Sequence, residues 1–176
     1  MRQEIRISGF GGQGIILMGY ITGKAATLFD SKNATFTQSY GPEARGGSCS
    51  AQVIISTEKI SYPVLIAPDI LITMSQAAYN TFYSGLKPDG ILIYDSLLVK
   101  PNNLQATQKI FQIPSKSIAG EIGKEIIANI VMLGYLVRVT GVVSPHAMQE
   151  SIASSIPVAM HELNFEAFKR GLNYNA

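Results

Sequence analysis

A glycine-rich loop near the N-terminus constrains the fold of this 176-residue chain more than any other feature. The loop, Gly9-Phe10-Gly11-Gly12-Gln13-Gly14, follows a strand-like run over 4–8 and precedes a proline-free, helix-like run over 15–28. Glycine adopts positive φ readily and lets a ligand or a neighbouring backbone approach closely. The following helix N-terminus offers free N–H groups and a partial positive charge to an anion. The order strand, glycine loop, helix therefore predicts an α/β fold, with either an anion site or a turn that serves only close packing.

The loop matches the fingerprint of NAD-binding sites only in part. Those sites need an acid at the end of the second strand, roughly 20 residues on, to bind the ribose. The second strand expected here, over 33–37, runs into Gln38 and Ser39, and Asp30 comes before it. The sequence thus argues against NAD, and a free-standing nucleotide- or coenzyme-binding enzyme remains an alternative.

A second polar loop, Ser39-Tyr40-Gly41-Pro42-Glu43-Ala44-Arg45-Gly46-Gly47, lies between two strand-like runs. Proline fixes its own φ and restricts the residue before it, so Gly41-Pro42 predicts a turn. Gly46 and Gly47 permit close approach of another surface. Between these turns stand the candidate catalytic residues Glu43 and Arg45. The planar guanidinium of Arg45 can bind a carboxylate or a phosphate through two hydrogen bonds. The alternative is a solvated ion pair on a surface turn.

The composition excludes several classes of protein. The chain is 47% hydrophobic and 15% charged, which excludes disorder and falls below the quarter of charged residues usual in globular monomers. This deficit fits a surface that is covered by partners. The net charge of +2 gives no argument for nucleic acid binding. No signal peptide or membrane-spanning run is expected, so we expect a cytoplasmic location.

Residues that bind metals or act as nucleophiles are scarce. Cys49 is the only cysteine, so the chain alone can supply neither a disulfide nor a four-cysteine metal or iron–sulfur site. Cys49 stands in an apolar run and is interpreted as a small buried hydrophobe rather than a catalytic thiol. His146 and His161 each precede a helix-like run, where a surface or capping role is expected.

The order of predicted strands and helices along the whole chain indicates a single domain over 1–176. Strand and helix signals alternate up to 113, and the chain is mostly helical from 118. We expect a Rossmann-like, three-layer α/β/α sandwich with a mostly parallel sheet and a helical C-terminal part. The runs 53–56 and 60–62 predict either a hairpin, which would add antiparallel strands, or one strand with a reversal. Five apolar residues at helical spacing predict one helix facing the sheet: Ile122, Ile126, Ile130, Leu133 and Val137. Asp95 and Ser96 follow a buried strand at the edge where ligands bind in such sheets.

Taken together, the two glycine loops resemble the gamma subunits of 2-oxoacid:ferredoxin oxidoreductases. The resemblance continues through Pro68-Asp69-Ile70-Leu71-Ile72, Met74-Ser75-Gln76, Asn129-Ile130-Val131-Met132-Leu133-Gly134 and Leu163-Asn164-Phe165-Glu166-Ala167-Phe168. It spans nearly the whole chain in the right order. The amino-acid sequence of the second loop is most similar to that of the 2-oxoglutarate branch of the family.

The resemblance implies a subunit rather than a complete enzyme. The family converts a 2-oxoacid and coenzyme A to an acyl-CoA and carbon dioxide, and passes the electrons to ferredoxin. It implies alpha, beta and delta subunits as partners, which carry thiamine diphosphate and iron–sulfur clusters, while this chain binds no cofactor alone. Coenzyme A is the co-substrate, and the residues expected to bind it are Gly9, Gly11, Gly12, Gly14, Arg45, Gly46 and Gly47. Two alternative functions remain. The chain could belong to a pyruvate- or branched-chain-2-oxoacid-specific enzyme, or it could be a purely structural adaptor.

Overall fold

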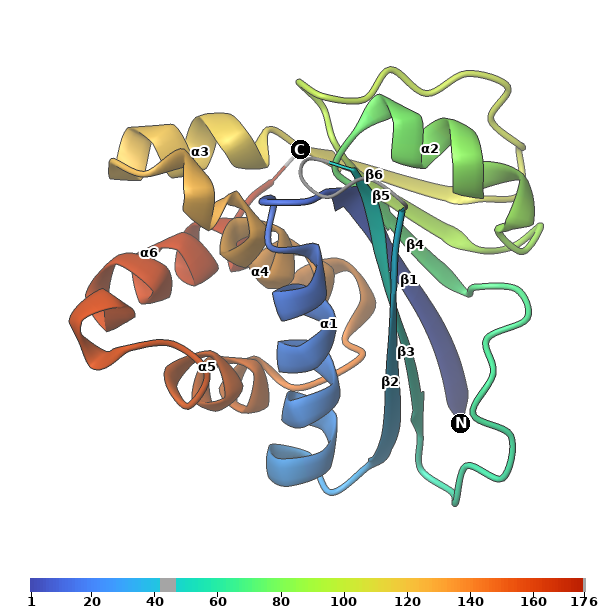
Figure 1. Ribbon diagram of the computed structural model, residues 1–176, viewed down its shortest axis with the longest axis horizontal. Helices are drawn as coiled ribbons and strands as arrows, with labels where there is room; N and C mark the ends of the chain where they lie inside the picture. Colours follow the sequence, from blue (N-terminus) through green and yellow to red (C-terminus); the bar gives the residue numbers. More distant parts are fainter. Residues whose placement is uncertain (42–46, 176) are drawn as a thin grey trace.

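Six strands form one mixed sheet in the order β2-β3-β1-β4-β5-β6 (Figure 1). The structure, a computed structural model, describes residues 1–41 and 47–175. β1 pairs in parallel with β4, β4 with β5 and β5 with β6, whereas β3 runs antiparallel to both β1 and β2. The strands are β1 (Arg2–Phe10), β2 (Asn33–Tyr40), β3 (Ser48–Ser56), β4 (Ile70–Thr73), β5 (Ile91–Asp95) and β6 (Lys109–Ile113).

The helices cover the two faces of this sheet unequally. One face carries α1, α4, α5 and α6, and α2 lies on the other (Figure 1). The helices are α1 (Ile15–Lys24), α2 (Gln76–Phe82), α3 (Ser115–Ile122), α4 (Ala128–Thr140), α5 (Pro145–Ala153) and α6 (His161–Leu172). Short turns are η1 (Ala25–Phe29, a π turn that continues α1), η2 (Tyr83–Gly85), η3 (Glu125–Ile127) and η4 (Val158–Met160). The three-layer α/β sandwich expected from the sequence is confirmed.

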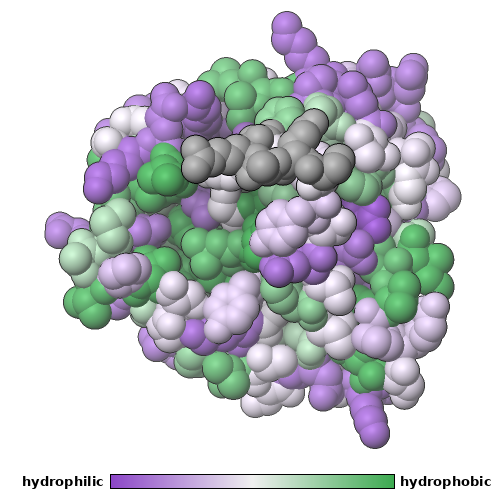
Figure 2. Space-filling view, in the orientation of Figure 1, coloured by the Kyte–Doolittle hydropathy of each residue, from purple (hydrophilic) through white to green (hydrophobic). Residues whose placement is uncertain are grey.

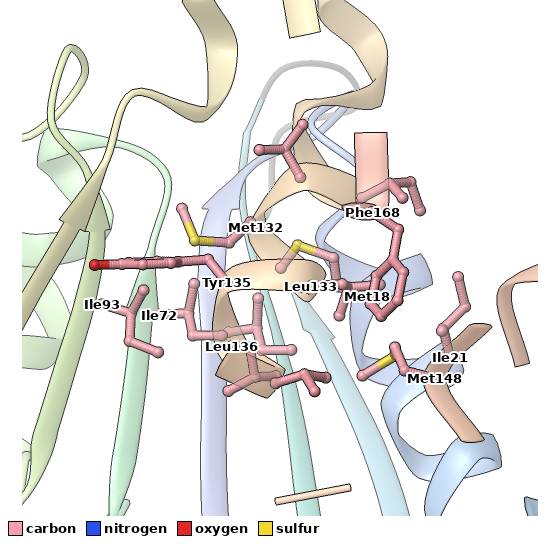
Figure 3. Packing of buried hydrophobic residues seen from close by; sticks show 14 of the residues in the cluster. Met18, Ile21, Ile72, Ile93, Met132, Leu133, Tyr135, Leu136, Met148 and Phe168 are labelled. Atoms are coloured by element: carbon pink, nitrogen blue, oxygen red, sulfur yellow. The ribbon is translucent and has the colours of Figure 1, made fainter. Parts of the chain in front are cut away.

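The main hydrophobic core lies between the sheet and α4. Every residue of α4 from Ala128 to Val137 is buried, because the helix is enclosed by the sheet, α1 and α6. Figure 3 shows Met132, Tyr135 and Leu136 directed toward Ile72 and Ile93, with Leu133 near Phe168 and Met18. A smaller cluster lies under α2, around Tyr79, Leu92 and Tyr94. No helix in the described part of the chain is both long enough and apolar enough to cross a membrane.

The hairpin expected over 53–62 is wrong. The antiparallel neighbours are β2 and β3, and residues 57–69 contain no strand. β1 and β3 each have both edges occupied, so a strand at 60–62 would find no free edge beside them. Pro63 and Pro68 also remove two backbone donors from this segment.

The prediction that one helix runs through Ile122, Ile126 and Ile130 is also wrong. α3 ends at Gly123, which has φ 119°, and α4 begins five residues later at Ala128. Ile126 lies in η3 and is 70% exposed, while Ile130, Leu133 and Val137 are buried as expected. The glycine allows a left-handed C-cap that a continuous helix would not need. Ser75 and Ser144 cap the starts of α2 and α5, and Gly141 caps the end of α4, as the local sequence at these positions predicts.

Candidate functional site

The glycine loop 9–14 connects the end of β1 to the start of α1. Gly14 is the N-cap of α1 with φ 74°, and Gly12 has φ 95°. Both angles lie in the left-handed region, which costs other L-residues roughly 1–2 kcal/mol. Gly12 and Gly14 are therefore required to be glycine by the backbone itself.

Close packing explains the glycines at either end of the loop, but not Gly12. A side chain on Gly9 would run into Gln13 and Ile15, and one on Gly14 would run into Asn129 of α4. A Cβ on Gly12 would meet no atom within 4 Å. The space beside Gly12 is open, so at this residue the loop can approach a ligand.

Gln13 holds the loop in place. Its side-chain oxygen accepts a hydrogen bond from the backbone N–H of Phe10 at 2.7 Å, and its amide nitrogen donates to the carbonyl of Met74 at 2.7 Å. These bonds tie the loop to the residue that follows β4. The sequence pattern assigned no role to Gln13, because only the folded chain brings Met74 beside it.

The two glycine loops lie side by side. The backbone N–H of Gly11 donates to the carbonyl of Gly47 at 2.9 Å, and Gly41 donates to Ser48 at 2.6 Å. Figure 1 shows the end of β2 and the start of β3 beside the start of α1. Pro42, Glu43, Ala44, Arg45 and Gly46 lie outside the described residues.

A groove of about 450 Å³ runs along the loop between α1 and the C-terminal helices. Figure 2 shows hydrophobic surface in the hollow left of centre, where these elements meet. A second hollow of about 280 Å³ lies on the other side of Gly12 and includes Lys116, whose ammonium pairs with Glu125 at 3.2 Å. The first groove is lined by Gly11, Gly12, Gly14, Tyr40, Ile126, Asn129, Ile156, Pro157, Met160 and Asn164, among others.

The start of α1 provides the positive end of a helix dipole beside this groove. The first turn has no acidic residue, and Gly14 has no side chain with which to cap it. The first N–H groups of a helix have no partner within the helix, so they can bind an anion. A polar backbone loop between two mostly apolar hollows suits a ligand that combines an anionic group with an extended apolar part.

The other polar residues that the sequence highlights have structural roles. Asp95 is fully buried, and its carboxylate accepts hydrogen bonds from Ser115 and from the backbone of Lys116 and Leu97, which fixes the start of α3. Asp30 accepts two hydrogen bonds from Ser144 after the π turn that continues α1. Neither carboxylate is placed to bind a ligand at the glycine loop.

Cys49 is buried in the main core and also lines the floor of the groove. Burial raises the pKa of its thiol, which keeps it protonated and weakly nucleophilic. The interpretation of Cys49 as a buried hydrophobe is confirmed. His146 is exposed near the start of α5, and a ring nitrogen of His161 lies 3.2 Å from the carbonyl of Ile156. Among the described residues, no group of His, Cys, Asp or Glu side chains could hold a metal ion.

Sequence reasoning missed the wall of the groove that comes from the C-terminal helices. Asn129 is 4% exposed and packs against Gly14, and Ile126 and Met160 complete the wall. Ile126 was expected to face the sheet. The one available signal was Asn129, a polar residue at the head of an otherwise apolar helix.

Comparisons with known proteins agree on one family. The family model for pyruvate ferredoxin/flavodoxin oxidoreductase matches residues 4–174. The chain is 48% identical over 173 residues to 2-oxoglutarate synthase subunit KorC of Methanocaldococcus jannaschii, covering 97% of this chain and 92% of the relative. It is 29% identical to pyruvate synthase subunit PorC of the same organism, with 97% and 95% covered.

Solved structures show the same fold. The gamma subunit of a keto/oxoacid ferredoxin oxidoreductase from Geobacter sulfurreducens superposes with a TM-score of 0.85 at 41% identity, covering 96% of this chain and 95% of that one. A 2-oxoglutarate:ferredoxin oxidoreductase from Magnetococcus marinus gives a TM-score of 0.85 at 23% identity, covering 97% of this chain and 30% of that one. The resemblance seen in the two glycine loops is thereby confirmed. The chain belongs to the pyruvate ferredoxin/flavodoxin oxidoreductase family.

Proposed function

We propose that this chain is the gamma subunit of a 2-oxoglutarate:ferredoxin oxidoreductase, and that its glycine loop binds a phosphate of coenzyme A. The reaction converts the 2-oxoacid and coenzyme A to an acyl-CoA and carbon dioxide, with ferredoxin as the electron acceptor. The 48% identity to a 2-oxoglutarate synthase subunit, against 29% to a pyruvate synthase subunit, supports 2-oxoglutarate over pyruvate.

One observation carries the role of the loop. Gly12 has a left-handed backbone and no packing partner at its Cβ position, and it lies beside the uncapped start of α1. Contact at the Cβ position does not explain this glycine, and Gly12, unlike the C-cap glycines Gly123 and Gly141, stands at a helix N-terminus, where backbone N–H groups can bind an anion. The mostly apolar groove alongside fits the uncharged arm of the same coenzyme.

The partners supply the rest of the chemistry in this proposal. Thiamine diphosphate and iron–sulfur clusters are proposed to reside on alpha, beta and delta subunits. For the clusters, the single cysteine of this chain supports that assignment, because it cannot supply four thiolates. The role proposed for Arg45 is to contact a carboxylate or phosphate at the partners' active centre, and that for Glu43 is to orient a donor there. Gly46 and Gly47 let this loop approach that surface.

Substitution of Gly12 tests the loop. In the assembled complex, Gly12→Ala is expected to raise the KM for coenzyme A about tenfold, equivalent to ~1.4 kcal/mol, with a smaller change in the KM for 2-oxoglutarate. Arg45→Lys keeps the charge but removes the planar fork, and it should lower turnover or raise either KM.

Gly141→Ala is the matched control for Gly12→Ala. Gly141 also has a positive φ, 59°, and a Cβ there would meet no atom within 4 Å, so alanine brings a similar backbone strain at the far end of α4. Gly90 is unsuitable, because a Cβ there would lie 2.9 Å from the carbonyl of Lys87. Equal KM values for coenzyme A in the Gly12 and Gly141 variants would leave the loop as a structural turn.

A free-standing nucleotide-binding enzyme is the second candidate. It predicts that a nucleotide or coenzyme A stabilises the isolated chain on its own, which a thermal unfolding series with added ligand measures. A structural adaptor responds to no ligand even within the complex.

A further inference from the structure

The extended segment 57–69 presents an apolar ridge to solvent. Tyr62, Val64 and Ile66 are 57%, 50% and 78% exposed, whereas Leu65 is 6% exposed. Ser61 and Pro63 are exposed as well, so within 61–66 only Leu65 turns inward. Figure 2 shows hydrophobic surface at the right-hand edge of the molecule, where this segment lies in Figure 1.

The ridge is anchored by side chains of β1. Arg2 donates from both terminal nitrogens to the carbonyl of Tyr62, each at 3.1 Å. Glu4 accepts from the backbone N–H of Ile66 at 3.1 Å and pairs with Arg2 at 2.8 Å. These bonds hold three large apolar side chains in exposed positions. Exposed apolar patches on soluble proteins usually mark interaction sites.

Arg6 lies on the same face of β1, two residues beyond Glu4. Its guanidinium stacks over the ring of Phe82 at 4.7 Å, and its buried Nε has no hydrogen-bond partner among the described residues. None of the ion pairs formed by described residues includes Arg6. Burial lowers the pKa of this guanidinium, which reflects a cation that is desolvated but not neutralised by a carboxylate.

The acidic side chains on and next to this face of β1 already have hydrogen-bond or ion-pair partners. Glu4 is held by Arg2 and Ile66, and Asp69 accepts from Lys87 at 2.5 Å and from the backbone of Glu4 at 2.7 Å. Arg6 therefore has no carboxylate partner among the described residues, and an acid on another molecule could neutralise it. A second copy of the chain that docked through the same face would bring Arg2 and Arg6, and its acids on that face would already be paired. Self-association through this face would therefore place like charges together and is disfavoured.

We propose that the surface formed by Tyr62, Val64, Ile66 and Arg6 is where another subunit of the oxidoreductase docks, supplying an apolar surface for the ridge and a carboxylate for Arg6. This inference rests on the proposed role as a subunit. The surface lies on the opposite face of the sheet from the coenzyme groove, so its loss affects assembly and not coenzyme binding.

The test titrates purified chain into the complex that lacks this subunit. Ile66→Asp is expected to weaken binding about 30-fold and Arg6→Gln about 10-fold, as for buried hydrophobic and arginine anchors. Added salt should weaken binding of the wild type more than that of Arg6→Gln. At saturating chain, the KM for coenzyme A should match that of the wild type, which separates this inference from the role of Gly12.

The controls are Leu28→Asp, a 66% exposed apolar residue in the π turn after α1, and Arg170→Gln, an exposed arginine paired with Glu121. Both should bind like the wild type. Thermal unfolding of each isolated variant checks that the chain itself is intact. Binding of Ile66→Asp and Arg6→Gln within twofold of the wild type overturns the proposal, as does an isolated dimer that Ile66→Asp dissociates.

Discussion

Gly12 and Gly14 both have positive φ, but they contribute differently to the site. Gly14 also lets Asn129 approach, so α4 and α1 meet at the loop. A Cβ on Gly12 would face open space, so this residue makes room for no neighbour in the core. Gly14 thus helps to build the site, whereas Gly12 is free to contact a molecule that enters it.

Ser144 joins the end of the α1 region to the start of α5. Its hydroxyl accepts from the N–H of Ala147 at 3.1 Å and donates to Asp30 at 2.7 Å, and its own N–H donates to Asp30 at 2.7 Å. Ser144→Ala should cost about 1–2 kcal/mol of unfolding free energy at pH 7, because it removes a helix cap. Ser154→Ala, which removes only a bond to the carbonyl of Glu150 and a longer one to Ser151, should be nearly neutral in the same denaturant titration.

The effect of Ser144→Ala should depend on pH. Burial alone would raise the pKa of Asp30, but the hydrogen bonds from Ser144 and the charge of Lys32 lower it below 3.8. A lowered carboxyl pKa stabilises the fold above the pKa of the unfolded chain, and this stabilisation disappears as the pH falls through the folded value. The difference between wild type and Ser144→Ala should therefore shrink below about pH 4. A constant difference from pH 7 to pH 3 would contradict this account.

At the scale of elements, α4 and α6 cross where two glycines meet. A Cβ on Gly171 would overlap the backbone of Val131, and one on Gly134 would overlap the backbone of α6. Gly171→Ala should lower the unfolding free energy by about 2–3 kcal/mol, because backbone cannot yield as a flexible side chain can. Equilibrium denaturation measures the change.

Gly120→Ala is the control for that substitution. Gly120 lies within α3, is exposed, and a Cβ there would make only an ordinary contact with Glu125 at 3.8 Å. Alanine should stabilise the helix by up to about 1 kcal/mol. Equal effects at Gly120 and Gly171 would mean that the crossing is not set by the glycines.

Local patterns predicted the elements whose partners are close in sequence or whose ends carry caps. The N-terminal strand, the glycine loop, α1 and the caps at Ser75 and Ser144 follow from residues within a few positions of each other. The segment 57–69 could not be predicted, because its conformation depends on β1 having both edges occupied. The far wall of the groove was missed for the same reason: Asn129 and Met160 reach Gly14 and Tyr40 only through the tertiary fold.

On the scale of the whole molecule, the sheet separates two surfaces. The groove along the glycine loop lies on the face that α1 and α4 cover, and the ridge with Arg6 lies on the face that α2 covers only in part. A subunit built in this way can contact a coenzyme on one side while it is held by a partner on the other. The low charge of the chain, 15%, agrees with a surface that is shared with partners.

The chain's own side chains fill the core of the described residues, which gives a prediction for the isolated chain. α4 is enclosed by the chain's own sheet and helices, and one cysteine cannot supply the thiolates of an iron–sulfur cluster. The purified chain should therefore contain no stoichiometric iron or thiamine diphosphate. A chelator should shift its Tm by less than about 1 °C, since a loss of 1 kcal/mol shifts a domain of this size by about 2–4 °C. Metal analysis and thermal unfolding, run beside the assembled complex, measure both quantities. Bound iron in the isolated chain, or a chelator-induced fall of several degrees, would show that the fold itself depends on a metal.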